Sequence, residues 1–185
     1  MPSISIPFLQ TLRADYREYP LFIETGTYVG DTIFSMEPHF RNLFTIELSE
    51  KYYNSTRSKY KGNKISFIHG DSSTKLIDVF SSVSEPSIIF LDGHWSSGDT
   101  AKGTKDCPLI EEISVINTHC KSKAIIIIDD RRLFGKNKTS GCNEDWSSIN
   151  DGDILHNIKA RVTDVYLLDS EIAKDDRMII HIDAI

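Results

Sequence analysis

Three aspartates follow two strongly apolar segments of this chain, and aspartates placed in this way can bind metal ions. Asp92 ends the apolar run 87–92, and Asp129 ends the run 124–129 and is followed by Asp130. Carboxylates packed together repel one another, and a hard divalent cation with oxygen ligands relieves that repulsion. If both runs are neighbouring strands of one sheet, the three aspartates form a candidate site for Mg²⁺ or Mn²⁺.

A histidine lies two residues beyond the first of these aspartates. His94 is a candidate general base, because imidazole takes up protons near neutral pH. Two alternatives remain for the acidic cluster and the histidine. His94 could only position another group, and Asp92 could only contact a cofactor. The later pair of aspartates could cap a loop or form ion pairs with Arg131 and Arg132.

An acidic turn that contains glycines follows the first expected strand, residues 21–24. Its letters are E-x-G-x-x-x-G, with Glu24 first and with Gly26 and Gly30 at the glycine positions. The dinucleotide-binding pattern G-x-G-x-x-G is absent, which argues against a nicotinamide-dependent oxidoreductase. An acidic residue at this point suits a ligand that carries an ammonium and a sulfonium group. An ordinary glycine-rich turn is the alternative.

Acidic residues also follow the second and third expected strands. Glu47 ends the strand 43–47, where a carboxylate can accept hydrogen bonds from both hydroxyls of a ribose. Asp71 follows the strand 65–69 and could accept a hydrogen bond from an adenine amino group. Asp71 could equally cap the next helix, and the two roles are compatible.

The elements that position these residues alternate between apolar runs and amphipathic stretches, which is typical of βαβ units around a parallel sheet. The fold expected is α/β, a Rossmann-like, doubly wound and mostly parallel sheet that ends in an antiparallel hairpin. We expect one domain over 1–185, with 1–20 as a short N-terminal helical extension. The expected strands are 21–24, 43–47, 65–69, 87–92 and 124–129, the hairpin is 162–168 with 178–182, and the expected helices are 6–18, 30–36, 51–60, one through Leu76 and Phe80, 109–118 and 146–161.

A long polar segment, 93–108, follows the fourth expected strand and contains three glycines. Long loops in compact domains are usually functional or disordered. We interpret 96–105 as a lid over an acceptor, and we expect 94–106 to be mobile until ligands bind.

Together these strand ends resemble the class I methyltransferases that use S-adenosylmethionine. The E-x-G-x-x-x-G turn resembles the first motif of that family, and the closing hairpin matches its antiparallel last strand. Glu47 matches the ribose-binding acid and Asp71 the adenine-side acid. The resemblance implies that S-adenosylmethionine binds at Glu24, Gly26, Thr27, Tyr28, Gly30, Asp31, Thr32, Glu47, Leu48, Asp71, Ser72 and Asp92.

The pairing of L-D-G-x-x with I-D-D is most similar to the metal-dependent O-methyltransferases, above all those that act on sugars. This implies that Asp92, Asp129 and Asp130 hold Mg²⁺ or Mn²⁺ and that His94 acts as the base with Asp92 beside it. His94 departs from the pattern, because the sugar enzymes carry an acidic residue there. The expected function is O-methylation of a sugar or glycan hydroxyl. The alternatives are a catechol-like acceptor, disfavoured by the polar loop after Asp92, and a non-catalytic binding module.

Composition narrows the possible partners. The 27 acidic and 21 basic residues give a net charge of −6, which argues against a nucleic-acid partner. No apolar run approaches the roughly 20 residues that span a bilayer, and residues 1–20 lack the features of a signal peptide. The cysteines, at 107, 120 and 142, form no CxxC pair, so we expect reduced thiols and a cytoplasmic location.

Overall fold

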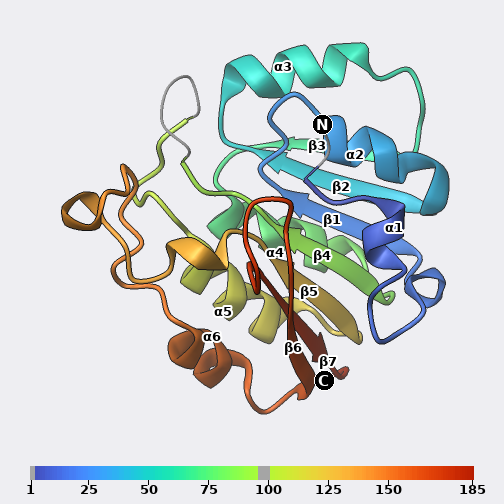
Figure 1. Ribbon diagram of the computed structural model, residues 1–185. Coiled ribbons are helices and arrows are strands. Elements are labelled where there is room, and N and C mark those ends of the chain that lie inside the picture. Colours follow the sequence, from blue (N-terminus) through green and yellow to red (C-terminus); the bar gives the residue numbers. More distant parts are fainter. Residues whose placement is uncertain (1–2, 96–100) are drawn as a thin grey trace.

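The computed structural model describes residues 3–95 and 101–185, and its described strands form one mixed sheet. The strand order is β3-β2-β1-β4-β5-β7-β6 (Figure 1), and β1 to β5 run parallel while β7 is antiparallel to both β5 and β6. This confirms the expected Rossmann-like sheet with its antiparallel end. The strands are β1 (Leu21–Thr25), β2 (Asn42–Glu47), β3 (Ile65–His69), β4 (Ser87–Leu91), β5 (Ala124–Ile128), β6 (Val162–Leu168) and β7 (Arg177–Ile182).

Helices cover both faces of the sheet (Figure 1), so the central strands are buried on both sides. Alternate residues of β1 point into the two cores: Ile23 packs with α4, α5 and α6, and Phe22 packs with α1 and α2. Such burial explains the unbroken apolar runs in β4 and β5. The α-helices are α1 (Ile6–Leu9), α2 (Asp31–Met36), α3 (Glu50–Lys59), α4 (Ser72–Ser82), α5 (Leu109–His119) and α6 (Asp151–Ile158), and the 3₁₀ helices are η1 (Tyr16–Glu18), η2 (Glu37–His39), η3 (Arg131–Leu133) and η4 (Lys138–Ser140).

Two expected helices are shorter in the structure. The segment 6–18 divides into α1 and η1, because the Asp15 side chain accepts a hydrogen bond from the Arg17 N–H and begins a new helical turn. The segment 146–161 is helical only in α6, where the Asn150 side chain caps the helix by accepting from the Asp153 N–H at 2.9 Å.

The order in which successive strands are added to the sheet reverses between β1 and β4. From β1 the chain adds β2 and β3 on one side, whereas β4 and β5 extend the sheet on the other side. In open α/β sheets, ligands bind beyond the carboxyl ends of the strands at this switch point. The residues that follow β1 and β4 are therefore the first candidates for a ligand site.

Among the described residues, no helix is both long and apolar enough to cross a bilayer. Cys107, Cys120 and Cys142 are free thiols with buried side chains.

Candidate cofactor and acceptor site

A cavity of about 610 Å³ lies at the carboxyl ends of the parallel strands. Its volume is in the range of sites for cofactors and other small molecules. Every residue expected to bind a cofactor lines this cavity except Gly30. Gly30 has a φ of 88°, and a Cβ there would lie 2.5 Å from Thr56 Cγ2, so this glycine serves the packing of α2 against α3. The lining includes Glu24, Gly26, Thr27, Tyr28, Asp31, Thr32, Glu47, Leu48, Asp71, Ser72 and Asp92.

Gly26 makes the turn after β1 possible. Its φ is 83°, in the left-handed region that side chains disfavour. A Cβ on Gly26 would lie 2.3 Å from the backbone oxygen of Asp92. Because Gly26 has no side chain, the turn after β1 can pack closely against the backbone at the end of β4.

Glu24 is a buried carboxyl group in the cavity wall, with only 1 % of its surface exposed. Its Oε2 accepts a hydrogen bond from Thr45 Oγ1 at 2.7 Å, and Thr45 also contacts Thr27 at 2.6 Å. Burial raises the pKa of Glu24 to about 8, and the Thr45 hydrogen bond only partly opposes this shift. Glu24 is therefore mostly protonated at neutral pH, and a cationic group in the cavity would favour its ionised form.

Glu47 is held by two backbone N–H groups. Its Oε2 accepts from the Tyr28 N–H at 2.8 Å, and its Oε1 accepts from the Ser49 N–H at 2.7 Å. Each carboxylate oxygen has a second lone pair, so the fixed side chain can still accept hydrogen bonds from two ligand hydroxyls.

Asp71 caps a helix, which is one of the two roles that the sequence allowed, and it also lines the cavity. Its Oδ1 caps α4 by accepting from the N–H and the hydroxyl of Ser73, at 2.9 and 2.6 Å. Its Oδ2 lies beside Gly103, where a Cβ would be 3.4 Å away, and Asp71 lines the cavity. One oxygen of Asp71 therefore caps the helix, while the other lies on the side of the cavity.

The described part of the long polar segment lies against this cavity. Ala101, Gly103 and Lys105 line it, and a Cβ on Gly103 would lie 3.5 Å from Leu48 Cδ2. At the two ends of the segment, the Trp95 N–H donates to the carbonyl oxygen of Asp106 at 2.7 Å. The structure thus places residues 101–105 of the expected acceptor lid beside Asp71, while residues 96–100 lie outside the described residues.

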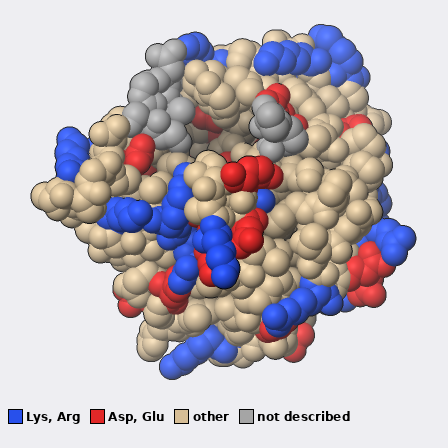
Figure 2. Space-filling view, viewed as in Figure 1, with Lys and Arg blue, Asp and Glu red and all other residues tan. Residues whose placement is uncertain are grey.

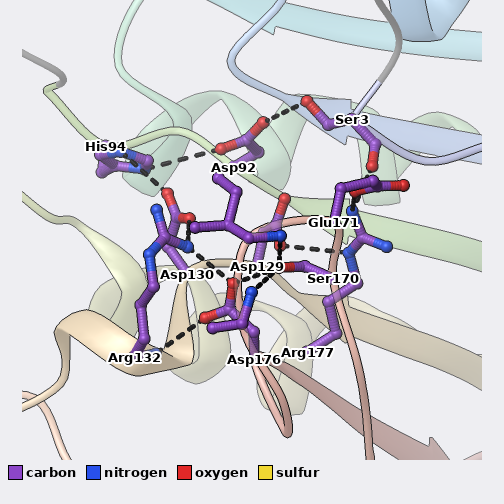
Figure 3. Close-up of polar contacts among 12 residues, drawn as sticks. Ser3, Asp92, His94, Asp129, Asp130, Arg132, Ser170, Glu171, Asp176 and Arg177 are labelled. Atoms are coloured by element: carbon purple, nitrogen blue, oxygen red, sulfur yellow. Dashed lines mark hydrogen bonds and ion pairs between the residues drawn. The ribbon is translucent and has the colours of Figure 1, made fainter.

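The expected acidic cluster lies at the ends of β4 and β5 (Figure 3). His94 stands between two of its members: Nδ1 is 3.6 Å from Asp92 Oδ1, and Nε2 is 3.2 Å from Asp130 Oδ2. These three side chains offer ligand atoms that all lie within 4.8 Å of one another. Asp130 has a φ of 59°, an uncommon conformation for a residue other than glycine, and such positions often occur at functional sites.

Asp129 is not part of the group formed by Asp92, His94 and Asp130, and its carboxylate contacts Arg177 instead. Arg177 Nε donates to Asp129 Oδ1 at 3.2 Å, and only 4 % of the Arg177 side chain is exposed. The structure therefore brings Asp92, His94 and Asp130 together, and it places Asp129 with Asp130 and Asp176 in a second group of carboxylates.

A second arginine neutralises part of the cluster. Arg132 bridges Asp130 and Asp176, with an N–O distance of 2.7 Å to Asp176. Arg132 therefore forms an ion pair with Asp130, which was one of the alternatives left open by the sequence. Arg131 instead pairs with Asp151.

The charges of the cluster shift the pKa values of its members. Burial, followed by the charges of Asp129 and Asp130, holds the pKa of Asp92 well above its usual value. Burial also raises the pKa of Asp129 to about 6, although Arg177 opposes this shift. Burial lowers the pKa of His94, against the effect of Asp130. The neutral form of His94 is therefore favoured near neutral pH, and a neutral imidazole has a nitrogen lone pair that can accept a proton.

Figure 2 shows a hollow on this face of the molecule, with acidic side chains at its rim and Lys and Arg side chains beside them.

The sequence did not predict three residues that contact the acidic cluster, namely Ser3, Asp176 and Arg177. Each comes from a segment far along the chain from the strand ends, and only the antiparallel position of β7 beside β5 brings Arg177 to Asp129.

Comparisons with known proteins identify the fold. No family model matches the sequence, and no curated protein sequence matches it. The structure is similar to the O-methyltransferase from Bacillus cereus in complex with S-adenosylhomocysteine, with a TM-score of 0.61, 14% identity, and coverage of 90% of this chain and 75% of that one. It is also similar to the O-methyltransferase TomG from Streptomyces achromogenes in complex with S-adenosylmethionine, with a TM-score of 0.58, 14% identity, and coverage of 91% and 74%.

A third similar structure is the N-methyltransferase NodS from Bradyrhizobium japonicum in complex with S-adenosylhomocysteine. Its TM-score is 0.55 at 12% identity, and the match covers 89% of this chain and 78% of that one. Because the identities are low, these matches show the fold alone. The chain has the fold of the class I S-adenosylmethionine-dependent methyltransferases.

Proposed function

We propose that this chain is an S-adenosylmethionine-dependent O-methyltransferase, assisted by a divalent metal, that methylates a hydroxyl of a sugar or glycan. One observation carries the proposal: Asp92 belongs both to the wall of the 610 Å³ cavity and to the acidic cluster that contains His94. A methyl donor in the cavity would therefore lie next to groups that can prepare an acceptor.

The cavity supplies a partner for each part of the cofactor. Glu24 would pair with the ammonium group, the two oxygens of Glu47 would accept from the ribose hydroxyls, and Asp71 would accept from the adenine amino group. The acceptor would approach from the side of Asp92 and His94. An acceptor bound there would approach the methyl donor in line, and such positioning supplies much of the rate acceleration of a transfer reaction.

The donor set of the acidic cluster fits a hard divalent ion. The candidate ligands are carboxylate oxygens, and burial, together with the charges of Asp129 and Asp130, raises the pKa of Asp92. Asp92 and Asp130 would hold Mg²⁺ or Mn²⁺, with Asp129 near enough to Asp130 to contribute. When bound, the ion would lower the pKa of the acceptor hydroxyl.

His94 would take the proton of that hydroxyl on a ring nitrogen. A lone pair of the acceptor oxygen would attack the methyl carbon, the carbon–sulfur bond would break, and S-adenosylhomocysteine would leave. The polar and charged side chains around His94 suit a hydroxylated acceptor better than an apolar phenol. The net charge of −6 likewise favours such an acceptor over nucleic acid.

A transfer assay tests this function. Labelled methyl groups from S-adenosylmethionine would be offered to a panel of sugars, nucleotide sugars, glycans and catechols, with Mg²⁺ or after EDTA treatment. We expect transfer to a sugar hydroxyl that EDTA abolishes and Mg²⁺ restores, and Asp130→Asn should act like EDTA. Transfer at the full rate in metal-free protein would contradict the role of the metal, and transfer to catechols alone would contradict the sugar acceptor.

A further inference from the structure

Ser3 connects three parts of the site through three polar contacts. Its N–H donates to Thr32 Oγ1 at 2.9 Å, and its hydroxyl donates to Asp92 Oδ2 at 3.2 Å. Its carbonyl oxygen accepts a hydrogen bond from the guanidinium group of Arg177 (Figure 3). Thr32 belongs to the first turn of α2, Asp92 follows β4, and Arg177 begins β7. One residue of the N-terminal segment therefore joins the cofactor turn to the acidic cluster.

Apolar burial fixes the segment that carries Ser3. Ile4 and Leu9 are 1 % and 0 % exposed and belong to the core on the α1 side of the sheet. Full burial of an aliphatic side chain is worth about 1.5–3 kcal/mol. Ser3 is therefore held in place by packing on its C-terminal side and does not depend on its polar contacts alone.

Arg177 provides the polar anchor of the same segment. Its guanidinium carbon lies 4.7 Å from the centre of the Phe8 ring, and its Nη2 donates to Glu171 at 2.9 Å. A buried arginine requires carboxylate partners, and Asp129 is one of them. Asp129 thus helps to hold the N-terminal segment through Arg177, a task separate from any ion binding.

We propose that Ser3 is a positioning residue for Asp92 and forms the wall where the cofactor cavity meets the acidic cluster, held there by the buried side chains of Ile4 and Leu9. The inference rests on the proposed cofactor site. Ser3 lines the cavity together with Thr32 and Asp92, so a bound cofactor would cover it. Because the Ser3 hydroxyl engages Oδ2 of Asp92, the other oxygen, Oδ1, is the one turned toward His94.

Cysteine labelling tests the position of the wall. Ser3→Cys would be labelled with a maleimide, with and without saturating S-adenosylhomocysteine, and the native cysteines give little background because they are buried. Ser5→Cys is the matched control: Ser5 is also half-buried, but it caps α1 and does not line the cavity. We expect S-adenosylhomocysteine to slow labelling at position 3 at least tenfold and to leave position 5 unchanged.

Calorimetry on the wild-type protein separates the two possible failures. Absence of S-adenosylhomocysteine binding would overturn the proposed function and this inference together. Binding without protection at position 3 would overturn the inference alone.

A second measurement isolates the hydroxyl of Ser3. Ser3→Ala keeps both backbone contacts and removes only the hydrogen bond to Asp92. We expect the affinity for S-adenosylhomocysteine to fall about three- to tenfold, as for loss of one hydrogen bond, and Ser3→Thr to restore it. Ser5→Ala should leave the affinity unchanged. An unaltered affinity in Ser3→Ala, or an equal loss in Ser5→Ala, would overturn the positioning role.

Discussion

Asp92 Oδ1 lies 3.6 Å from His94 Nδ1, and both residues line the 610 Å³ cavity, so an acid of the cavity wall contacts the candidate base there. The turn Asp92–Gly93–His94 carries both side chains from the end of one buried strand, β4. A rigid strand positions such groups more reliably than a free loop would. This relationship makes His94 the first residue to test.

Replacement of His94 separates proton transfer from binding. His94→Ala should slow methyl transfer by roughly 10²–10⁴, the usual range for loss of a general base. Binding of S-adenosylhomocysteine, measured by calorimetry, should stay within about twofold of the wild-type value, because no expected contact with the cofactor is removed. His156→Ala, at an exposed position of α6, is the control. A transfer rate in His94→Ala equal to that of the control would rule out the proposed base.

A glycine substitution tests the contact between the turn after β1 and the end of β4. Gly26→Ala adds a Cβ where Asp92 O is 2.3 Å away, and it also forces alanine to adopt a φ of 83°. Gly141→Ala shares the strain, with a φ of 82°, but meets nothing within 4 Å. We expect Gly141→Ala to cost about 1–2 kcal/mol of stability, and Gly26→Ala to cost more and to abolish S-adenosylhomocysteine binding.

Thermal unfolding and calorimetry would compare these two variants directly. Equal losses of stability, with cofactor binding retained in both, would show that the close approach at Gly26 does not shape the cavity.

Glu24 should link stability and cofactor binding to pH. Its pKa rises from 4.5 to about 8 on folding, so the folded protein holds the proton more tightly than the unfolded chain. The contribution of Glu24 to the free energy of unfolding is therefore greatest below pH 4.5 and falls as the pH rises toward 8. Glu24→Gln should flatten the decline of stability across this interval in denaturant titrations.

The raised pKa of Glu24 also predicts that the protein releases a proton when S-adenosylhomocysteine binds. At pH 7 an ammonium group beside Glu24 would favour its ionised form, so S-adenosylhomocysteine should displace roughly one proton from the wild-type protein and almost none from Glu24→Gln. Calorimetry in two buffers with different ionisation enthalpies measures this number. Equal proton release by both proteins would assign the ionisation to another group.

Most of the sheet could be predicted from the sequence, because buried parallel strands leave unbroken apolar runs such as 124–128, and acidic residues mark their ends. The first and last residues of the helices were harder to predict from the sequence. Asn150 starts α6 later than expected, and Trp146, which precedes it, is buried in the core outside any helix.

The partners of the acidic cluster could not be predicted in the same way. Arg177 reaches Asp129 from β7, and Ser3 reaches Asp92 from the N-terminal segment. Contacts between segments so distant in sequence depend on the tertiary arrangement, which no local pattern of residues records. The position of residues 101–105 is a similar case, since the composition of that loop indicated a lid but could not show that these residues line the same cavity as Glu47 and Asp71.

The most direct test of the central claim is calorimetric titration of the wild-type protein and of Glu47→Ala with S-adenosylhomocysteine, with NAD as the competing ligand. We predict micromolar binding of S-adenosylhomocysteine to the wild type and no binding of NAD. Glu47→Ala should weaken binding by roughly 1–3 kcal/mol, because the ribose hydroxyls lose their acceptor. Tight binding of NAD without any response to S-adenosylhomocysteine would contradict the account.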